Sequence, residues 1–325
     1  MTSGTTTPVL RPGDLAELRA AMLDTTGPLA VAGAGTAASW GATLGPVDAV
    51  LDTTTLTGVI VHNPGDLTVA VRAGTPLRAL HDELGVHAQR VSLDAARIAD
   101  GATVGGLLAT GDAGPAALVF GSLRDLVIGV TLVLADGTVA RSGGHVIKNV
   151  AGYDLAKVVH GSYGTLAVVA EVVLRLHPVP KAVVTLQLPC SLPDAVAIAA
   201  AVLGGPAEPA ALEWTSDGVL LLRLEGTEAA LDARAERVRK MLGSDAAVAG
   251  GDPWARHAEI TRGAPDAAVL RVGVRPSRLP AVLAAMPSTA FTAGLGTGVA
   301  TVTLPAAAVA DAHDAVHAVG GTSVV

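Results

Sequence analysis

Residues 141–176 read RSGGHVIKNVAGYDLAKVVHGSYGTLAVVAEVVLRL, and this stretch decides how the fold of the chain is interpreted. Glycines break its first part into loops around one short helix, for which Asp154 is the expected N-cap. After the turn at Gly164, an apolar strand runs to Leu176. Backbone N–H groups beside glycine are not shielded by side chains, so such loops suit the close approach of a large ligand. Glycine is also the usual residue of tight turns, so the stretch alone leaves both interpretations open.

The composition of the chain limits what the protein can do. Half of its 325 residues are hydrophobic but only 2% are aromatic, so Ala and Val must fill the core, and the length allows two domains. A net charge of −7 without a basic block argues against nucleic-acid binding. The single cysteine, Cys190, excludes an intrachain disulfide and a cysteine metal cluster, which fits a reducing cytoplasm. We therefore expect a cytoplasmic protein without a signal peptide or an integral membrane segment.

Short strands and helices alternate in the first part of the chain. Helical spacing of apolar residues predicts a helix capped by Asp14 and a second helix capped by Thr75, with Pro76 at its first position. Asp136-Gly137 predicts a hairpin turn. Strands are expected at 29–31, 47–52, 59–62, 67–72, 126–134 and 138–141, and a loop followed by a short helix at 101–111.

The pattern changes at residues 177–181, HPVPK, where prolines stop the preceding strand and glycine-rich loops become rare. We expect a domain boundary there, with one domain at 1–180 and another at 181–325. Beyond it, the order strand, helix, strand, strand, helix, strand occurs twice, which predicts one antiparallel ferredoxin-like sheet with helices on one face. The expected strands are 183–188, 211–215, 219–224, 268–273, 289–293, 299–304 and 322–325, and the expected helices are 192–203, 227–242, 277–286 and 306–318. The expected fold class is α+β.

Residues 31–38, VAGAGTAA, are similar to the glycine fingerprint of a Rossmann fold, and Asp52 ends the next strand like its ribose-binding acid. A Rossmann crossover helix needs about 10 uninterrupted residues. Glycines and a proline between 41 and 46 leave only residues 36–40, so no such helix fits. The loop still presents consecutive unshielded N–H groups, a nest that suits a pyrophosphate.

Four segments in chain order resemble the FAD-binding domain of the vanillyl-alcohol oxidase/PCMH-type flavoprotein superfamily, and within it the FAD-binding subunits of bacterial glycolate oxidases. They are AGAGTAASWG (32–41), GATVGGLLATGDAGP (101–115), FGSLRDLVIGVTLVLADGTVARSGG (120–144) and HVIKNVAGYDLAKVVHGSYGTLAVVAEVVLRLHP (145–178). KNVAGYD followed by Gly-Ser-x-Gly-Thr-Leu is the most specific part. The resemblance implies a PCMH-type FAD-binding domain of two subdomains, followed by a substrate or cap domain.

The same resemblance implies which residues contact FAD. The pyrophosphate would be wrapped by Gly33, Ala34, Gly35, Thr36 and Ala37. The flavin side would be lined by Thr103, Val104, Gly105, Gly106, Thr110, Gly111 and Gly114. Ser122 and Asp125 would lie near the path from adenosine to flavin, and main-chain atoms of Gly164, Val168 and Val169 would complete the pocket. Because few Lys and Arg residues are nearby, backbone N–H groups are the expected partners of the pyrophosphate charges.

Departures from the family pattern also carry information. The first loop has neither the His nor the Cys with which some relatives attach FAD covalently, so noncovalent FAD is implied. FTAGLGTGVATV (291–302) lacks the His, Asp and Asn residues of the metal and substrate motif in relatives that oxidise 2-hydroxy acids alone. Such an oxidation needs a base or a metal, and the sequence identifies neither a catalytic residue nor a metal site. Position 112 is Asp where Asn, Ala or Ser is common. The polar cluster Lys148, Asn149, Tyr153 and Asp154 is expected to anchor its loop.

Three functions remain open. The first is a noncovalent FAD-binding oxidoreductase subunit of a glycolate- or D-lactate-oxidising complex, which would pass electrons from a small 2-hydroxy acid through flavin. Its partners would be a second flavin subunit and an iron–sulfur subunit, through which it could associate with a membrane. The second is a stand-alone FAD-linked 2-hydroxy-acid dehydrogenase. The third is a non-catalytic scaffold subunit that keeps the flavin fold without binding FAD.

Overall fold

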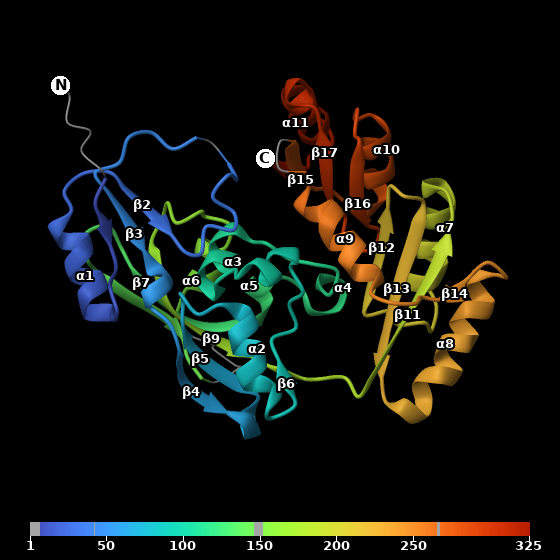
Figure 1. Ribbon diagram of the computed structural model, residues 1–325, viewed down its shortest axis with the longest axis horizontal. Coiled ribbons are helices and arrows are strands. Elements are labelled where there is room, and N and C mark those ends of the chain that lie inside the picture. The colour runs from blue at the N-terminus through green and yellow to red at the C-terminus, as the bar shows by residue number, and fades with distance from the viewer. Residues whose placement is uncertain (1–6, 42, 146–151, 265–266) are drawn as a thin grey trace. The chain divides into compact units, whose positions relative to one another are not determined.

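The computed structural model describes residues 7–41, 43–145, 152–264 and 267–325 (Figure 1). The chain forms two units, each with its own core. The first unit contains the chain up to Gly114 together with Phe120–Val179, and the second contains Pro115–Val119 and Pro180–Val325. The sequence predicted a single division after residue 180. In the structure, Pro115–Val119 also belong to the second unit, and Leu118 packs against its core. The role of the second unit as a substrate or cap domain stays a prediction.

A three-stranded parallel sheet begins the first unit, in the order β1 (Val9–Leu10), β3 (Ala49–Asp52), β2 (Leu29–Ala32). Helix α1 (Leu15–Asp24) starts as predicted, because Asp14 Oδ1 accepts a hydrogen bond of 2.8 Å from the N–H of Glu17. The predicted strands of this region are confirmed. Leu18 of the helix and Leu51 of the sheet form a small buried cluster with residues of the larger sheet described next.

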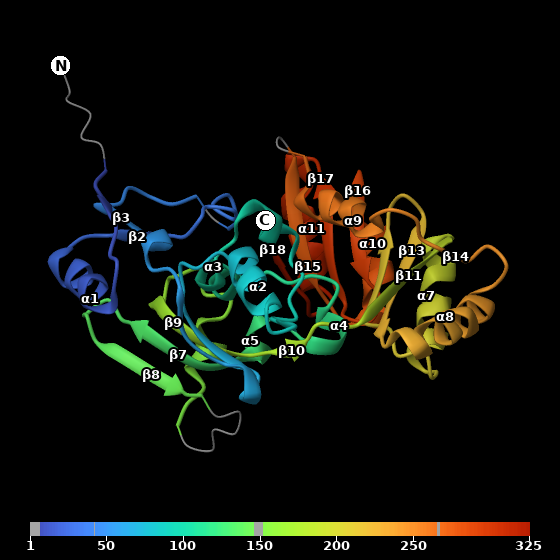
Figure 2. The same cartoon turned by 60° about the horizontal axis from the view of Figure 1, so that its bottom comes forward.

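The larger sheet of the first unit has five antiparallel strands in the order β4, β5, β9, β7, β8, and Figure 2 shows β8, β7 and β9 side by side. Their bounds are Val59–Asn63, Thr68–Arg72, Val168–Arg175, Val127–Val133 and Val139–Gly143. The hairpin at Asp136-Gly137 is confirmed, and Asp136 Oδ1 accepts the N–H of Thr138 at 2.9 Å. Val168 and Ala170 of β9 pack toward the small sheet, whereas Val169 and Val172 join the larger core. Strand β9 therefore contributes side chains to both cores, in agreement with the predicted arrangement of two subdomains.

Five helices and one short two-stranded sheet complete the first unit and its border. They are α2 (Leu77–Gly85), α3 (Val104–Thr110), α4 (Ala117–Phe120), α5 (Leu123–Leu126), α6 (Leu155–Val159), β6 (Gln89–Arg90) and β10 (His177–Pro178). The predicted cap of α2 is wrong by one residue: the helix begins at Leu77, and Pro76 is its N-cap. The Thr75 hydroxyl instead accepts the N–H of Gly58 at 2.9 Å, so it is not available to cap the helix.

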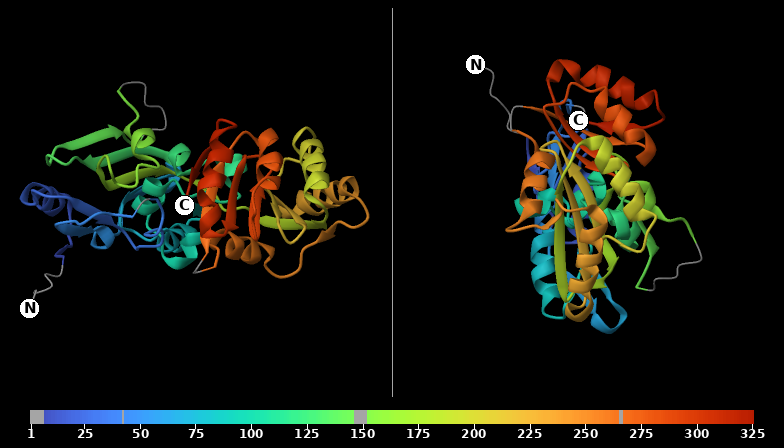
Figure 3. Two further views of the ribbon diagram at one scale, coloured as in Figure 1. Left: turned by 90° about the horizontal axis from the view of Figure 1, so that it is seen from above. Right: turned by 90° about the vertical axis from the view of Figure 1, so that its right-hand side faces the viewer.

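The second unit is an eight-stranded antiparallel sheet in the order β14, β11, β13, β12, β16, β17, β15, β18 (Figure 3). Its elements are β11 (Ala182–Pro189), α7 (Leu192–Leu203), β12 (Ala211–Thr215), β13 (Val219–Gly226), α8 (Glu228–Leu242), β14 (Ala247–Val248), α9 (Pro253–Arg262), β15 (Ala268–Gly273), α10 (Leu279–Ala284), β16 (Ala290–Gly294), β17 (Val299–Leu304), α11 (Val309–His317) and β18 (Thr322–Val324). Each half has the ferredoxin-like order of fourth, first, third and second strand, and the second strands, β12 and β16, join the halves. The predicted repeat is confirmed.

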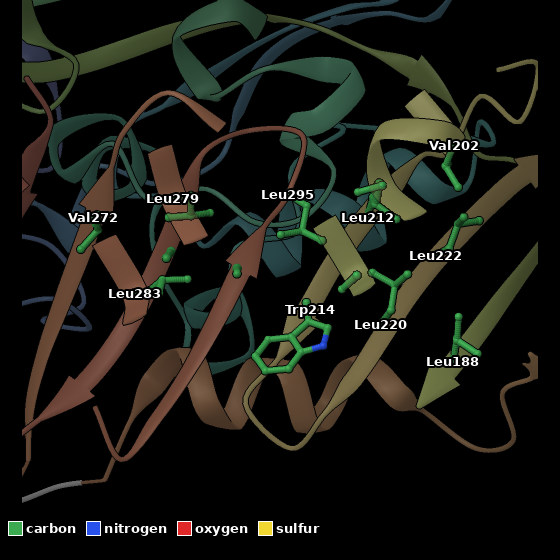
Figure 4. Close-up of a cluster of buried hydrophobic side chains, with 14 of the residues drawn as sticks. Leu188, Val202, Leu212, Trp214, Leu220, Leu222, Val272, Leu279, Leu283 and Leu295 are labelled. Atoms are coloured by element: carbon green, nitrogen blue, oxygen red, sulfur yellow. The ribbon is translucent and has the colours of Figure 1, made fainter. Parts of the chain in front are cut away.

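The core of the second unit contains Trp214 and Leu222 from the sheet together with apolar residues of α7, α8, α10 and α11 (Figure 4). Helix α9 was not predicted, although Asp252-Pro253 is a helix start signal. Its His257 contacts Glu213, which neighbours Trp214 in β12 and therefore points to the opposite face of the sheet. The expectation of helices on one face only is thus wrong, because α9 covers the second face. None of the helices in the described part of the chain is long and apolar enough to cross a membrane.

His81 of α2 makes the stability of the first unit depend on pH. Its Nε2 lies 2.9 Å from the carbonyl oxygen of Val91. Burial lowers the pKa of His81, and the charge of Arg90 adds to this effect, against the hydrogen bond to Val91 and the charge of Asp82. The unfolded chain then takes up a proton that the folded state resists, so stability is complete above the unfolded pKa of 6.5 and falls as the pH drops below it.

We expect the free energy of unfolding of His81→Gln to change less between about pH 7.5 and about pH 5.5 than that of the natural protein. Urea unfolding of the apoprotein at both pH values measures this difference. His317→Gln is the matched control, because His317 is exposed on α11. Equal pH slopes for the natural protein and His81→Gln would contradict the assignment.

Candidate cofactor site

The loop that follows β2 presents a row of free backbone donors. In the described part of the chain, the N–H groups of Ala34, Gly35, Thr36 and Ala37 donate to no protein atom, and the first internal bond of the loop is the N–H of Ala38 to the carbonyl of Gly35 at 3.1 Å. Gly35 has a φ of +73° and open space around it. Consecutive unpaired N–H groups in such a turn form a nest for an anion, so the loop fits the pyrophosphate of FAD.

This loop crosses the start of α3 at Gly33. A Cβ atom added to Gly33 would lie 2.8 Å from Thr103 Oγ1, which leaves no room for a side chain. The Thr103 hydroxyl is itself held in place, because it caps α3 by accepting the N–H of Gly106 at 3.1 Å. The first and second predicted FAD segments therefore meet at this crossing.

The backbone N–H groups of Val104 and Gly105, two further residues predicted to contact FAD, are engaged within the protein. The N–H of Val104 donates to the carbonyl of Thr75 at 2.9 Å, and the N–H of Gly105 donates to the carbonyl of Ala73 at 2.7 Å. The Val104 side chain is fully buried in the core of the first unit. Through these two hydrogen bonds, Val104 and Gly105 hold α3 against the loop that follows strand β5.

The far end of α3 joins the fourth predicted segment. The N–H groups of Gly161 and Tyr163 donate to the carbonyls of Leu108 and Ala109 at 3.1 and 2.9 Å. A Cβ atom added to Gly164 would lie 3.3 Å from Val31 Cβ, so this segment also touches the end of β2. Three of the four predicted segments therefore converge around α3.

Other predicted residues at this end form turns and packing contacts. Thr110 Oγ1 donates to the carbonyl of Gly106 at 2.9 Å, and Gly111 ends α3 with a φ of +64°. A Cβ atom added to Gly114 would lie 2.3 Å from the carbonyl oxygen of Asp94, so only glycine fits there. Val168 and Val169 are buried, one in each core of the first unit.

The third predicted segment, 120–144, lines a cavity on another part of the first unit. Ser122 and Asp125 form a capping box, in which Asp125 Oδ2 accepts the N–H of Ser122 at 2.9 Å. Asp125 lines a cavity of about 310 Å³ together with Arg124, Lys157 and Arg175. The FAD contacts assigned to Ser122 and Asp125, like those of all the other named site residues, stay predictions.

The polar cluster of the 145–154 loop is partly described. Lys148 and Asn149 lie outside the described residues. Asp154 caps α6 as predicted, since its Oδ1 accepts the N–H of Lys157 at 3.3 Å, and its Oδ2 lies 3.0 Å from Lys157 Nζ. The Tyr153 side chain is 88% exposed.

A buried charge cluster at the site was not identified from the sequence. Arg97 Nη1 lies 3.5 Å from Asp112 Oδ2, and the two side chains are only 8% and 4% exposed. The Arg97 guanidinium carbon lies 4.2 Å from the centre of the Trp40 ring. The unusual Asp at position 112 was the sequence signal for this cluster, but its partners were not evident.

Asp52, the acid of the rejected Rossmann alternative, has a structural position. Its carboxylate accepts hydrogen bonds from Thr54 Oγ1 at 2.6 Å and from Arg11 Nε at 3.0 Å. Burial alone would raise the pKa of Asp52, but these hydrogen bonds outweigh it and lower the pKa. The oxygens of Asp52 are therefore engaged by neighbouring side chains, which gives this residue a structural role rather than that of a ribose-binding acid.

In the second unit, a buried pair could hold or move a proton. His257 Nε2 lies 3.3 Å from Glu213 Oε2, and both side chains are 9% exposed. The sequence did not reveal this pair, because Glu213 and His257 are 44 residues apart in the chain. Among the described residues, no group of three or more His, Cys, Asp and Glu side chains is arranged to hold a metal ion.

Sequence comparison finds that part of the first unit is similar to FAD-binding domains. Residues 7–143 match the family model described as FAD binding domain. The chain is 35% identical over 188 residues to the glycolate oxidase subunit GlcE of Escherichia coli, which covers 58% of this chain and 52% of that protein. It is 37% identical over 163 residues to a D-lactate dehydrogenase of Archaeoglobus fulgidus, and this match covers 50% of this chain and 36% of that protein. It is 38% identical over 121 residues to the glycolate oxidase subunit GlcD of Bacillus subtilis, and this match covers 37% of this chain and 26% of that protein. The chain thus spans about half the length of these relatives or less.

Structure comparison supports the fold over nearly the whole chain. A solved structure of alkyldihydroxyacetonephosphate synthase matches with a TM-score of 0.72 at 17% identity, covering 97% of this chain and 71% of that chain. At this identity the likeness concerns the fold alone. The predicted PCMH-type architecture and the prediction of FAD as the cofactor are confirmed.

Proposed function

We propose that this protein, whose residues 7–143 match the FAD binding domain model, is a noncovalent FAD-binding oxidoreductase subunit of a complex that oxidises a small 2-hydroxy acid. The observation that carries the proposal is the row of unpaired N–H groups at Ala34–Ala37, which crosses α3 at the Gly33–Thr103 contact. The relatives named glycolate oxidase subunit and D-lactate dehydrogenase support glycolate and D-lactate as the substrates to test.

The residues of the site divide the work of holding the cofactor. When bound, FAD would supply the two-electron oxidation of the hydroxy acid. The N–H nest of Ala34–Ala37 would stabilise the charges of the pyrophosphate. The main-chain atoms of Gly164, Val168 and Val169 would complete the pocket wall, while the side chains of the two valines are buried in the two cores of the first unit. The loop at 32–41 contains no His or Cys that could form a covalent link to the flavin, so binding is proposed to be reversible.

The relatives and the cysteine count support the proposal of partner subunits. GlcE and GlcD are both named as subunits, which supports a second flavin subunit as a partner. An iron–sulfur cluster needs several cysteine ligands, and this chain has only Cys190. We therefore propose that a separate iron–sulfur subunit accepts the electrons. A cytoplasmic location, with membrane association through these partners, belongs to the same proposal.

A stand-alone dehydrogenase is the second candidate. The D-lactate dehydrogenases among the relatives favour it, and so does the buried Glu213–His257 pair, which is a chemically suitable proton acceptor. This candidate differs from the first in one measurable respect, because the chain would oxidise its substrate without partners.

The absorbance of the purified chain tests the proposal. We expect flavin bands, with FAD recovered in the supernatant after heat denaturation because the link is noncovalent. Under anaerobic conditions, glycolate or D-lactate should bleach the flavin only when the partner subunits are present. Bleaching of the isolated chain would favour the stand-alone dehydrogenase. A colourless chain that takes up no FAD would contradict both candidates and support a scaffold.

A further inference from the structure

We propose that Arg97 is the positioning residue of the cofactor site, holding the loop that carries the N–H nest and the loop that follows α3 in one fixed arrangement. The inference rests on FAD binding by the first unit and adds a residue that was not assigned to the site. Arg97 belongs to the short 3-10 helix Ala96–Asp100, which directly precedes the predicted segment at 101–115.

The guanidinium of Arg97 contacts both loops at once. On one side its central carbon lies 4.2 Å from the centre of the Trp40 ring. Trp40 belongs to the nest loop, since its N–H donates to the carbonyl of Ala37 at 3.1 Å. On the other side, Arg97 Nη1 lies 3.5 Å from Oδ2 of Asp112, which is two residues beyond the end of α3. A single side chain therefore connects two of the converging FAD segments.

Charge explains why this position carries arginine. Residues 32–41, 94–114 and 161–169 contain no Lys or Arg other than Arg97. Asp112 places a buried negative charge in the loop predicted to line an anionic cofactor, and that charge would weaken binding unless it is neutralised. A guanidinium can stack on an aromatic ring with its face and bond a carboxylate with its edge, which the compact ammonium of lysine cannot do.

The effect of Arg97 on FAD binding can be measured separately from its effect on folding stability. The contact between Arg97 and Asp112 is one N–O pair at 3.5 Å rather than a bidentate fork, so it is a weak hydrogen bond. Replacing both members of a buried ion pair by apolar residues is often neutral for stability, whereas removing one member takes away the charge that balances the other. A variant without both charges can therefore fold well and still lack the connection between the loops.

Four variants test the proposal: Arg97→Met, Arg97→Lys, Asp112→Leu and the double variant Arg97→Met/Asp112→Leu. FAD is removed, the unfolding midpoint of each apoprotein is recorded, and FAD is then titrated back. We expect Arg97→Met to lower both the midpoint and FAD affinity. The double variant should recover the midpoint of the natural protein but bind FAD about tenfold more weakly or worse. Arg97→Lys should keep the charge and the midpoint, yet recover FAD affinity only in part.

Arg11→Met is the matched control, because Arg11 pairs with Asp52 at 3.0 Å in the same unit but is exposed. Its FAD affinity should stay within about twofold of the natural protein. A Trp40→Leu variant should weaken FAD binding as Arg97→Met does, and combining the two should add little, because both break the same contact. Natural FAD affinity in the double variant, or simple additivity of Trp40→Leu and Arg97→Met, would overturn the inference. Failure of the natural chain to bind FAD would instead refute the proposed function.

Discussion

Replacing Gly33 with valine is expected to weaken FAD binding by about 100-fold, equivalent to about 2.7 kcal/mol. A Cβ atom at this position would lie 2.8 Å from Thr103 Oγ1, and valine adds two further methyl groups. Thr103 cannot turn away without giving up its hydrogen bond to Gly106, which caps α3. The nest loop would have to move off α3, so the N–H groups of Ala34–Ala37 would leave the converged site. Titration of the apoprotein with FAD measures the loss.

Gly45→Val is the matched control for this substitution. Gly45 lies further along the same connection between β2 and β3, and an added Cβ atom would meet nothing within 4 Å. Its FAD affinity should therefore stay within about twofold of the natural protein. In a Gly33→Ala background, Thr103→Ala should restore part of the affinity, because it removes the atom that blocks the new Cβ. Equal effects of Gly33→Val and Gly45→Val would show that the crossing at Thr103 is not required for FAD.

Replacing Trp214 with alanine is expected to destabilise the protein by about 3–5 kcal/mol. The Trp214 side chain lies in the core of the second unit (Figure 4) and is 7% exposed. Its ring centre lies 5.4 Å from that of Phe291. Its Nε1 donates to the carbonyl of Cys190 at 3.1 Å, a contact that alanine also removes. Because the buried core around Trp214 consists mainly of the smaller side chains of Leu, Ala and Val, we expect neighbouring side chains not to close the resulting cavity.

Urea unfolding of the apoprotein measures the effect of Trp214→Ala. Val248→Ala serves as the control in the same sheet, because the Val248 side chain is 61% exposed on the edge strand β14. Its free energy of unfolding should change by less than about 0.5 kcal/mol. A loss below about 1 kcal/mol for Trp214→Ala would mean that the core is repacked around the missing ring.

Local sequence signals predicted the elements that depend on local interactions. The helix caps at Asp14 and Asp154 and the hairpin at Asp136-Gly137 involve partners two or three residues away, so the relevant hydrogen bonds are encoded in a few neighbouring residues. The repeated strand and helix order of the second unit was equally clear, because each strand and helix buries one face with a regular period.

Long-range contacts account for the elements that were missed or misplaced. Helix α9 is too polar to predict from periodicity alone, and its burial depends on Glu213, which lies 44 residues from His257 in the chain. The cap of α2 shifted because the Thr75 hydroxyl bonds the N–H of Gly58, 17 residues earlier. These choices depend on which partner is within reach after folding.

The sequence by itself determined that glycine loops and a family resemblance point to an FAD site, and it named the segments involved. Only the tertiary structure decided which donors in those segments are free. The N–H groups of Ala34–Ala37 remain unpaired among the described residues, whereas those of Val104 and Gly105 are engaged by the carbonyls of Thr75 and Ala73. The physical reason is that each N–H group donates mainly to one acceptor, and that acceptor can lie about 30 residues away along the chain.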